Sequence, residues 1–406
     1  MAANSWCTKI VDGVFRPLRL GQMVMHWPNG EIKTYGQELS GITARIDVKD
    51  WLFFRNCCLY GDVGFGEAYV AGHWDTDNIT NVIRWMIHNV EHHPTLMADS
   101  VKWTPVNWFR FFNTLAHQLR DNTLTGSKRN ISAHYDLGND FFKLFLDETM
   151  AYSSGYFING HESLYQAQIN KFEGWCRKLR LKSSDHLLEI GSGWGGFALY
   201  AAKHYGCRIT TITISKEQYA LAKKLFKEQK VDHLIDIQLV DYRHVTGKYD
   251  KIISIEMIEA VGHKFLPVYV DAICHLLKTD GVVGLQMILS PDHRYDSFRK
   301  NVDWIQKHIF PGSLLPSMKA IHDAMFKTGN LNIFDYEDIS PSYVKTLALW
   351  RERFNANKQA VLAQGFDEAF IRKWNYYLSY CEAAFDMRNI AVVQGVFTRP
   401  NNHLLK

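Results

Sequence analysis

The chain of 406 residues lacks the features that mark several common classes of protein. No run of about eighteen apolar residues occurs, which argues against a transmembrane helix. The 46 basic and 42 acidic residues leave a net charge of only +4, so the charge balance gives no electrostatic footprint for nucleic acid. Contact with a membrane is therefore expected to be peripheral, at the surface.

Cysteine is scarce, and its spacing is uninformative. The seven cysteines occur singly apart from the adjacent Cys57 and Cys58, with no CxxC pair and no histidine at a metal-ligand spacing. This pattern predicts no metal site. Together with the absence of a signal peptide after "MAANSWCTKI", it predicts reduced thiols and a cytoplasmic location.

The composition, with 47% hydrophobic residues, is sufficient for a large core and predicts two domains. Residues 21–36, "GQMVMHWPNGEIKTYG", alternate around a Pro-Asn-Gly turn as a hairpin does, and "VIRWMIHNV" at 82–90 has the pattern of an amphipathic helix. We expect a small α+β domain at residues 1–120. A polar, glycine-containing linker is expected at 121–130, and a second domain at 131–406.

The second domain contains a strand, a glycine turn and a helix in close succession. His186–Ile190, "HLLEI", is a short apolar run, and apolar residues recur at helical spacing from Phe197 onward. Between them, Gly191, Gly193 and Gly195 allow the backbone to approach a ligand closely. Many nucleotides would suit such a turn, and a tight connection without a ligand would also explain it.

The following segments alternate between strand and helix. Strands are predicted at 208–214, 235–241 and 249–261, with a helix at 216–229. This alternation favours a doubly wound parallel α/β sheet, whose ligands bind at the carboxyl ends of the strands. Asp241, Glu256 and Glu259 fall at or just beyond such ends.

The residues after the second strand argue against a dinucleotide. The acidic ribose ligand usual about twenty residues past the glycines is absent, and polar Thr213, Ser215 and Gln218 stand there instead. Glu189, just before the glycines, would repel a pyrophosphate. It suits a cationic ligand with an amino group, such as S-adenosylmethionine.

Several blocks between His134 and Ser317 together resemble one enzyme family. They are "HYDLGNDFFKLFLDETMAYSSGYF", "LLEIGSGWGGFALYAA", "TTITISKEQYALA", "KYDKIISIEMIEAVGHKF" and "IFPGSLLPS". These blocks are similar to those of the cyclopropane-fatty-acyl-phospholipid synthases, and "EMIEAVGH" is most like the plant and plant-like bacterial branch. The resemblance implies a class I, Rossmann-like methyltransferase domain after a smaller amino-terminal domain that helps to present lipid.

The resemblance also implies an activity. Members of the family transfer the methyl group of S-adenosylmethionine to the double bond of an unsaturated acyl chain, forming a cyclopropane ring and S-adenosylhomocysteine. The expected partner is an unsaturated phospholipid or another acyl lipid at a membrane surface, and a homodimer is the expected assembly.

Family positions that bind the cofactor are matched by residues of this chain. By resemblance, we expect a first group to wrap the methionine and sugar: Tyr135, Gly138, Tyr152, Ser153, Gly191, Gly193 and Trp194. Glu189 is expected to face the amino group. Thr213 and Gln218 match the ribose edge, and Asp241 and Tyr242 match the adenine edge. Asp241 is also suited to cap a helix.

In the resembled family a bound bicarbonate is the base that removes the final proton. Glu259 and Tyr343 match two of its ligands. Ser154 stands where a cysteine is usual and Gln286 where a histidine is usual, while Ala260 replaces the histidine that often follows the glutamate. A base held differently can remove a different proton, so a ring, a methylene branch and a methyl branch all stay open as products.

Two further functions also stay open. Small-molecule N- or C-methyltransferases of the alkaloid type share the catalytic domain, but they lack the first domain and usually keep the Glu-His pair. A cofactor-binding subunit without activity is suggested only by Ser154 and Gln286.

Overall fold

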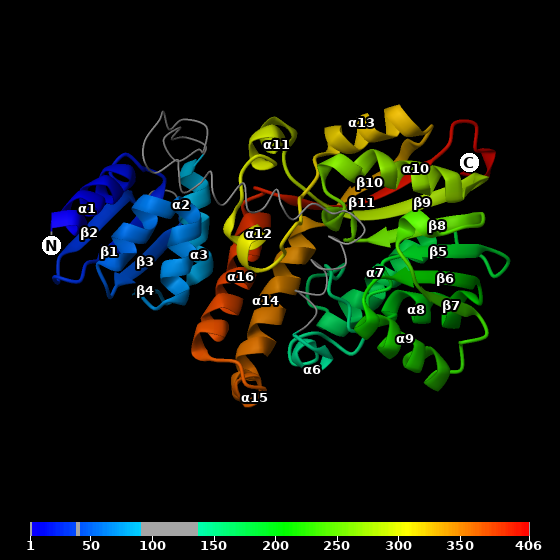
Figure 1. Ribbon diagram of the computed structural model, residues 1–406, viewed down its shortest axis with the longest axis horizontal. Helices are drawn as coiled ribbons and strands as arrows, with labels where there is room; N and C mark the ends of the chain where they lie inside the picture. The colour runs from blue at the N-terminus through cyan, green and yellow to red at the C-terminus, as the bar shows by residue number, and fades with distance from the viewer. Residues whose placement is uncertain (1, 38–40, 91–136, 406) are drawn as a thin grey trace. The chain divides into compact units, whose positions relative to one another are not determined.

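The computed structural model describes residues 2–37, 41–90 and 137–405 (Figure 1). The chain divides into two compact units. The first comprises Met1–Leu119, Asp296–Phe310 and Trp350–Asn389, and the second comprises the remainder. The predicted linker at 121–130 lies outside the described residues, so that boundary stays a prediction. The first unit also contains two later segments that sequence analysis assigned to 131–406.

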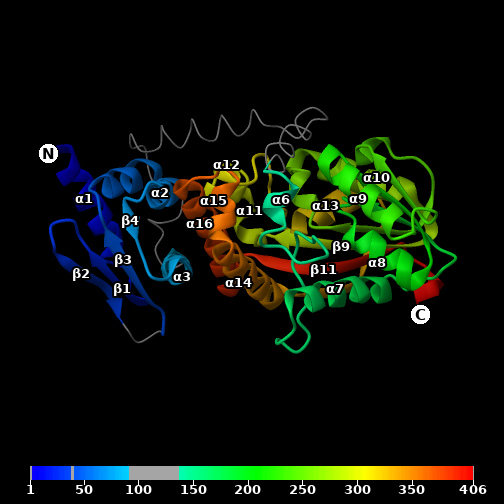
Figure 2. The ribbon, with the colours of Figure 1, turned by 90° about the horizontal axis from the view of Figure 1, so that it is seen from below.

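The first unit contains a four-stranded sheet with the order β2-β1-β3-β4 (Figure 2). The strands are β1 (Gly21–His26), β2 (Ile32–Gln37), β3 (Thr43–Val48) and β4 (Trp74–Asp75). The predicted hairpin is confirmed, because β1 and β2 pair antiparallel across a turn in which Gly30 has a φ of 87°. A positive φ of this kind favours glycine.

Helices from both ends of the chain complete this unit. They are α1 (Ala2–Phe15), α2 (Leu52–Val70), α3 (Ile79–Val90), α12 (Trp304–His308), α15 (Lys358–Ala363) and α16 (Glu368–Asp386). The predicted amphipathic helix corresponds to α3, which packs on β1 and β3. Buried Thr80 of α3 donates to Glu382 of α16 at 3.2 Å, and Arg372 donates to the carbonyl of Trp74 at 2.8 Å. These bonds fix a carboxyl-terminal helix against amino-terminal elements.

The second unit is built on a seven-stranded sheet with the order β10-β11-β9-β8-β5-β6-β7. Its strands are β5 (His186–Ile190), β6 (Arg208–Thr213), β7 (Ile235–Leu239), β8 (Tyr249–Ile255), β9 (Leu277–Leu289), β10 (Asn332–Asp338) and β11 (Ala391–Thr398). β5 to β9 run parallel, and β11 is antiparallel to both of its neighbours. The predicted doubly wound sheet is therefore confirmed. The strand order reverses beside β5, which is where such sheets bind ligands.

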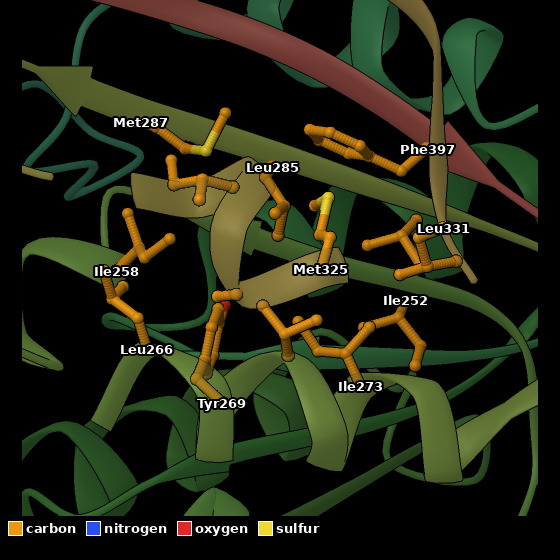
Figure 3. Close-up of a cluster of buried hydrophobic side chains, with 14 of the residues drawn as sticks. Ile252, Ile258, Leu266, Tyr269, Ile273, Leu285, Met287, Met325, Leu331 and Phe397 are labelled. Atoms are coloured by element: carbon orange, nitrogen blue, oxygen red, sulfur yellow. The ribbon is translucent and has the colours of Figure 1, made fainter. Parts of the chain in front are cut away.

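Helices cover both faces of this sheet (Figure 1). On one face α7 (Leu164–Lys178), α8 (Gly196–Tyr205) and α9 (Lys216–Glu228) bury apolar side chains against the strands. On the other face lie α10 (Leu266–Leu276) and α13 (Met318–Thr328). Figure 3 shows Leu266, Tyr269 and Ile273 of α10 directed toward Leu285 and Met287 of β9. Two apolar layers thus hold the strands rigid beneath the site.

One predicted strand ends earlier than expected. The sequence predicted a fourth strand from Tyr249 to Val261, but β8 ends at Ile255. Glu256 follows with a φ of 49°, which is left-handed and cannot continue a strand. A 3₁₀ turn, η4 (Ile258–Ala260), comes next. The two carboxylates Glu256 and Glu259 therefore lie in the loop beyond the carboxyl end of β8.

The structure also bears on two other features of the sequence. No helix of residues 2–37, 41–90 and 137–405 has the length and apolar character needed to cross a bilayer. The seven cysteines, all within these ranges, are free thiols.

Candidate active site at the carboxyl ends of the parallel strands

The three glycines after β5 have different roles. All have a positive φ: 98° at Gly191, 49° at Gly193 and 92° at Gly195. A Cβ added at Gly195 would lie 2.8 Å from the ring of Phe226, so this glycine is required by packing. Around Gly193 no atom of the described residues lies within 4 Å of such a Cβ. The space beside Gly193 therefore suits a ligand that approaches the backbone closely.

Glu189 on β5 is a buried carboxyl group at the base of this turn. Its side chain is 3% exposed and accepts a hydrogen bond from the hydroxyl of Thr211 on β6. Burial raises the pKa of Glu189 to about 8, and the Thr211 hydrogen bond opposes this only in part. An ammonium group nearby would stabilise the ionised carboxylate, so Glu189 fits a ligand with a cationic amino group.

Aromatic rings gather beside the glycine turn. The indole N–H of Trp194 donates to Asn139 at 2.6 Å, and the Trp194 ring lies 5.0 Å from that of Phe142 on α6 (Asn139–Phe142). The Tyr152 ring lies 5.3 Å from the same Phe142 ring. Gly138 precedes α6 with a φ of 86° and open space at its Cβ position. Tyr135, the remaining residue of this predicted group, lies outside the described residues.

The predicted ribose and adenine residues lie at the ends of β6 and β7. The Thr213 hydroxyl donates to the side-chain oxygen of Gln218 at 2.9 Å, and both residues are buried. Asp241 begins the 3₁₀ turn η3 (Tyr242–His244), and both of its oxygens accept from Arg243. Burial raises the pKa of Asp241, but these bonds more than offset burial and hold it below its usual value. The alternative noted from the sequence, a helix cap, is thus present at Asp241.

Three of the four predicted catalytic residues converge on one carboxylate, that of Glu256. One oxygen of Glu256 accepts from the backbone N–H of Ser154 at 2.9 Å and from the amide of Gln286 at 2.7 Å. The other oxygen accepts from the Tyr343 hydroxyl at 2.9 Å. Ser154 enters this network only through its backbone, because its hydroxyl donates to the carbonyl of Gly155. Sequence analysis placed Glu256 at a strand end but assigned it no role.

The packing of α7 on β9 sets the orientation of the Gln286 amide. A Cβ at Gly284 would lie 2.6 Å from the Trp175 ring, so the indole can pack here only because residue 284 has no side chain. The Trp175 N–H donates to the Gln286 oxygen at 3.1 Å, and Gln394 of β11 donates to the same oxygen at 3.0 Å. Because an indole N–H can only donate, the Gln286 oxygen faces Trp175. Its NH₂ group therefore faces Glu256.

Glu259, the fourth predicted catalytic residue, has different partners. One of its oxygens accepts from the backbone N–H of Ile288, which lies on β9 beyond the last residue paired with β8. Its other oxygen is buried and has no hydrogen-bond partner among the described residues. Burial and the charge of Glu256 raise the pKa of Glu259 to about 8. Ala260 follows it in the η4 turn.

A buried lysine that the sequence did not reveal lies near Glu256. Lys171 on α7 is 1% exposed and donates to the hydroxyl of Ser153, one of the predicted cofactor residues, at 2.6 Å. Burial lowers the pKa of Lys171 to about 8, while the charges of Glu256 and Asp147 raise it. Burial likewise raises the pKa of Glu256, against the opposing effects of Lys171 and the three donors.

The donors expected to hold bicarbonate are thus bound to a side chain of the protein. Tyr343, Gln286 and the Ser154 N–H all donate to Glu256. A bicarbonate ion would gain them only by displacing that carboxylate, so these residues do not fit bicarbonate in the arrangement observed. The turn around Gly193 and Glu189, in contrast, fits S-adenosylmethionine in both space and charge.

Comparisons with known proteins show the family to which the chain belongs. Residues 122–395 match the family described as mycolic acid cyclopropane synthetase. The chain is 38% identical to a tuberculostearic acid methyltransferase of Mycobacterium tuberculosis over 84% of this chain and 79% of that protein. It is 34% identical to the cyclopropane-fatty-acyl-phospholipid synthase of Escherichia coli over 88% of each.

A solved structure extends the comparison to the fold. A mycolic acid cyclopropane synthase complexed with SAH and CTAB superposes with a TM-score of 0.62 and 29% identity, covering 67% of this chain and 98% of that one. The class I methyltransferase fold and the family resemblance expected from the sequence are both confirmed.

The open position at Gly193 predicts a selective effect on binding. We expect Gly193→Val to abolish measurable affinity for S-adenosylmethionine, because the branched side chain fills the space beside the turn. The matched control is Gly30→Val in the β1–β2 hairpin, which has a similarly positive φ and open surroundings. Titration calorimetry on both folded variants checks this. Unchanged affinity in Gly193→Val would assign the turn to packing alone.

The raised pKa of Glu189 predicts proton release on binding. Below pH 8 the free carboxyl group is mostly protonated, and a ligand ammonium favours its ionised form. Affinity for S-adenosylmethionine should therefore rise with pH between 6 and 8, by up to about tenfold per unit. Calorimetry in two buffers of different ionisation enthalpy measures the released protons. Glu189→Gln should release fewer, and equal release by both proteins would contradict the assignment.

Proposed function

The chain belongs to the mycolic acid cyclopropane synthetase family as an S-adenosylmethionine-dependent lipid methyltransferase, and we propose that it methylates the double bond of an unsaturated fatty acyl chain. The proposed substrate is an unsaturated phospholipid, and the proposed product carries a cyclopropane ring. The observation that carries this proposal is the hydrogen-bond network of Glu256 at the carboxyl end of β8, in the same sheet as the glycine turn after β5.

The residues of this site match what the reaction demands. Bound S-adenosylmethionine supplies an electrophilic methyl group. Because an alkene is a poor nucleophile, the chain must hold the two in line and keep water out. Ring closure then requires a base that takes one proton from the added methyl group. Glu259 is buried and Glu256 is half-buried, and both carboxyl groups have a raised pKa, as such a base requires.

We propose the cofactor contacts that the resemblance implies. Glu189 meets the amino group, and a set of residues surrounds the methionine and sugar: Tyr135, Gly138, Tyr152, Ser153, Gly191, Gly193 and Trp194. The ribose lies at Thr213 and Gln218. The adenine lies at Asp241 and Tyr242, and Arg243 keeps the Asp241 carboxylate ionised to accept from the adenine amine.

Bicarbonate is the base that the resemblance implies. Glu259 has one buried oxygen without a hydrogen-bond partner among the described residues, and this oxygen suits a donor such as the bicarbonate hydroxyl. Tyr343, however, donates to Glu256. The proposed reaction therefore contains no step through bicarbonate.

A second candidate function keeps the same site but changes the product. The chain is 38% identical to the tuberculostearic acid methyltransferase of Mycobacterium tuberculosis, and this similarity supports a methyl- or methylene-branched acyl chain as the alternative product. Methyl transfer to a small molecule is a further alternative. Peripheral association with the membrane and a homodimer complete the proposal.

The product decides between these functions. The chain is expressed in a bacterium that lacks its own synthase, fed with methionine labelled by three deuterons on the methyl group. In lipid from a parallel culture without label, we expect high-field cyclopropane protons in the proton NMR spectrum. In lipid from the labelled culture, we expect the mass to show that two of the three deuterons are retained. Exo-methylene or methyl signals would redirect the assignment to branching. Unmodified lipid, with Gly193→Val as the inactive control, would contradict lipid methylation.

The network predicts that Gln286 acts on turnover rather than on cofactor affinity. Gln286→Ala removes a donor to Glu256 and should lower kcat by at least about tenfold, while affinity for S-adenosylmethionine stays within about twofold. Ser154→Cys should be tolerated, because Ser154 reaches Glu256 only through its backbone N–H. Steady-state kinetics and calorimetry measure both effects. Normal turnover in Gln286→Ala would assign Gln286 to the core.

A further inference from the structure

We propose that the carboxylate of Glu256 takes the place of bicarbonate and is itself the base that removes the proton from the added methyl group. This inference rests on the proposed function and deepens it by naming the catalytic base. It makes the reaction independent of any bound anion.

The donor set around Glu256 carries the inference. A backbone N–H at Ser154, a side-chain amide at Gln286 and a phenol at Tyr343 donate to its two oxygens within 2.9 Å. The resemblance assigns the same positions to bicarbonate. A glutamate side chain ends in a planar group of two oxygens on one carbon, which these donors can bind as they would bind the anion. The carboxylate is then a covalently attached form of the base.

The backbone at Glu256 supports a specific placement of this side chain. Its φ of 49° is left-handed, a strained conformation that non-glycine residues rarely adopt. The strained turn is held by a hydrogen bond from the Glu256 N–H to the carbonyl of Gln286 at 2.8 Å. It directs the side chain toward donors from the Ser154 loop, from β9 and from α14 (Ser340–Ala356). A residue needed only to end a strand would not require all of these contacts.

Charge and burial suit the group to accept a proton. Buried Lys171 and the three donors stabilise the ionised carboxylate, while burial keeps it more basic than an exposed glutamate. Glu259 is the second carboxylate nearby, and it is held separately by the Ile288 N–H. Glu256 is thus a half-buried carboxyl group with a raised pKa at the strand end where the sheet binds ligands.

The step balances without another reactant. After the carbon–carbon bond to the methyl group has formed, the electron pair of one methyl C–H bond closes the ring onto the electron-deficient carbon of the acyl chain. The proton passes to an oxygen of Glu256. Release of that proton to water restores the carboxylate before the next turnover.

The first experiment tests the need for bicarbonate and for the carboxylate. In buffer freed of carbon dioxide, the wild-type rate should stay within about twofold of the rate with added bicarbonate. Glu256→Gln should lower kcat by about 100-fold or more, the loss typical of a missing general base, with unchanged affinity for S-adenosylmethionine. Glu228→Gln, an exposed position at the end of α9, is the matched control and should keep full activity.

A second variant tests whether the donors can hold an exchangeable base. Glycine accepts the positive φ of position 256, so Glu256→Gly should fold and leave the Ser154, Gln286 and Tyr343 donors exposed to a small anion. We expect a low rate that bicarbonate or formate restores by about tenfold or more, in a concentration-dependent manner. Binding of S-adenosylmethionine verifies that the variant is folded.

Three results would overturn the inference: a wild-type enzyme that slows when bicarbonate is removed, a Glu256→Gln variant that turns over normally, or a folded Glu256→Gly variant that neither anion rescues. Each of these results differs from the result expected if the proposed function is wrong. If the proposed function is wrong, the wild-type protein itself yields no methylated lipid, with or without bicarbonate.

Discussion

An ionised carboxylate removed from water must be compensated by donors or cations, and this requirement organises the site around Glu256. Without compensation its burial would cost several kcal/mol. The compensation comes from the charge of Lys171 and from three hydrogen-bond donors. The three donors are Ser154, Gln286 and Tyr343, which lie far apart along the chain. Each must be placed within hydrogen-bond distance of the same two oxygens. The carboxylate therefore fixes a loop, a central strand and a helix relative to one another.

The sheet supplies the rigidity that this arrangement needs. β8 and β9 are paired up to Gln286, so the end of β8 and the donor on β9 are set by strand register. Trp175 fills the space left by Gly284 and holds the Gln286 amide from behind. The glycine turn follows β5, the neighbour of β8 in the same parallel sheet. Parallel strands thus bring the turn and the carboxylate to one edge of the sheet, although the two are far apart in the sequence.

The sequence predicted what local patterns determine. Strand, glycine turn and helix followed from apolar periodicity, and resemblance identified Tyr343, Gln286 and Ser154. It did not predict the end of β8, because apolar residues continue beyond Ile255 in "YDKIISIEMIEAV" and nothing in this segment reveals the positive φ of Glu256. The burial of Lys171 was equally hidden, since a lysine on a helix is usually exposed. Such features depend on tertiary packing. It is the strand register in the structure, which pairs Ile255 with Gln286, that places Glu256 beside the Gln286 amide.

The departures from the family pattern acquire a common reason if Glu256 is the base. A histidine at position 286 could carry a proton, and an imidazolium beside Glu256 would lower the pKa of the carboxylate and weaken it as a base. Gln286 donates a hydrogen bond without bringing a charge, so the carboxylate stays bound yet basic. The side chain of residue 154 needs no thiol, because only the backbone N–H is used. A glutamate that acts as the base therefore favours a neutral donor at position 286. A bound bicarbonate ion, in contrast, would be held more tightly by a cationic donor there.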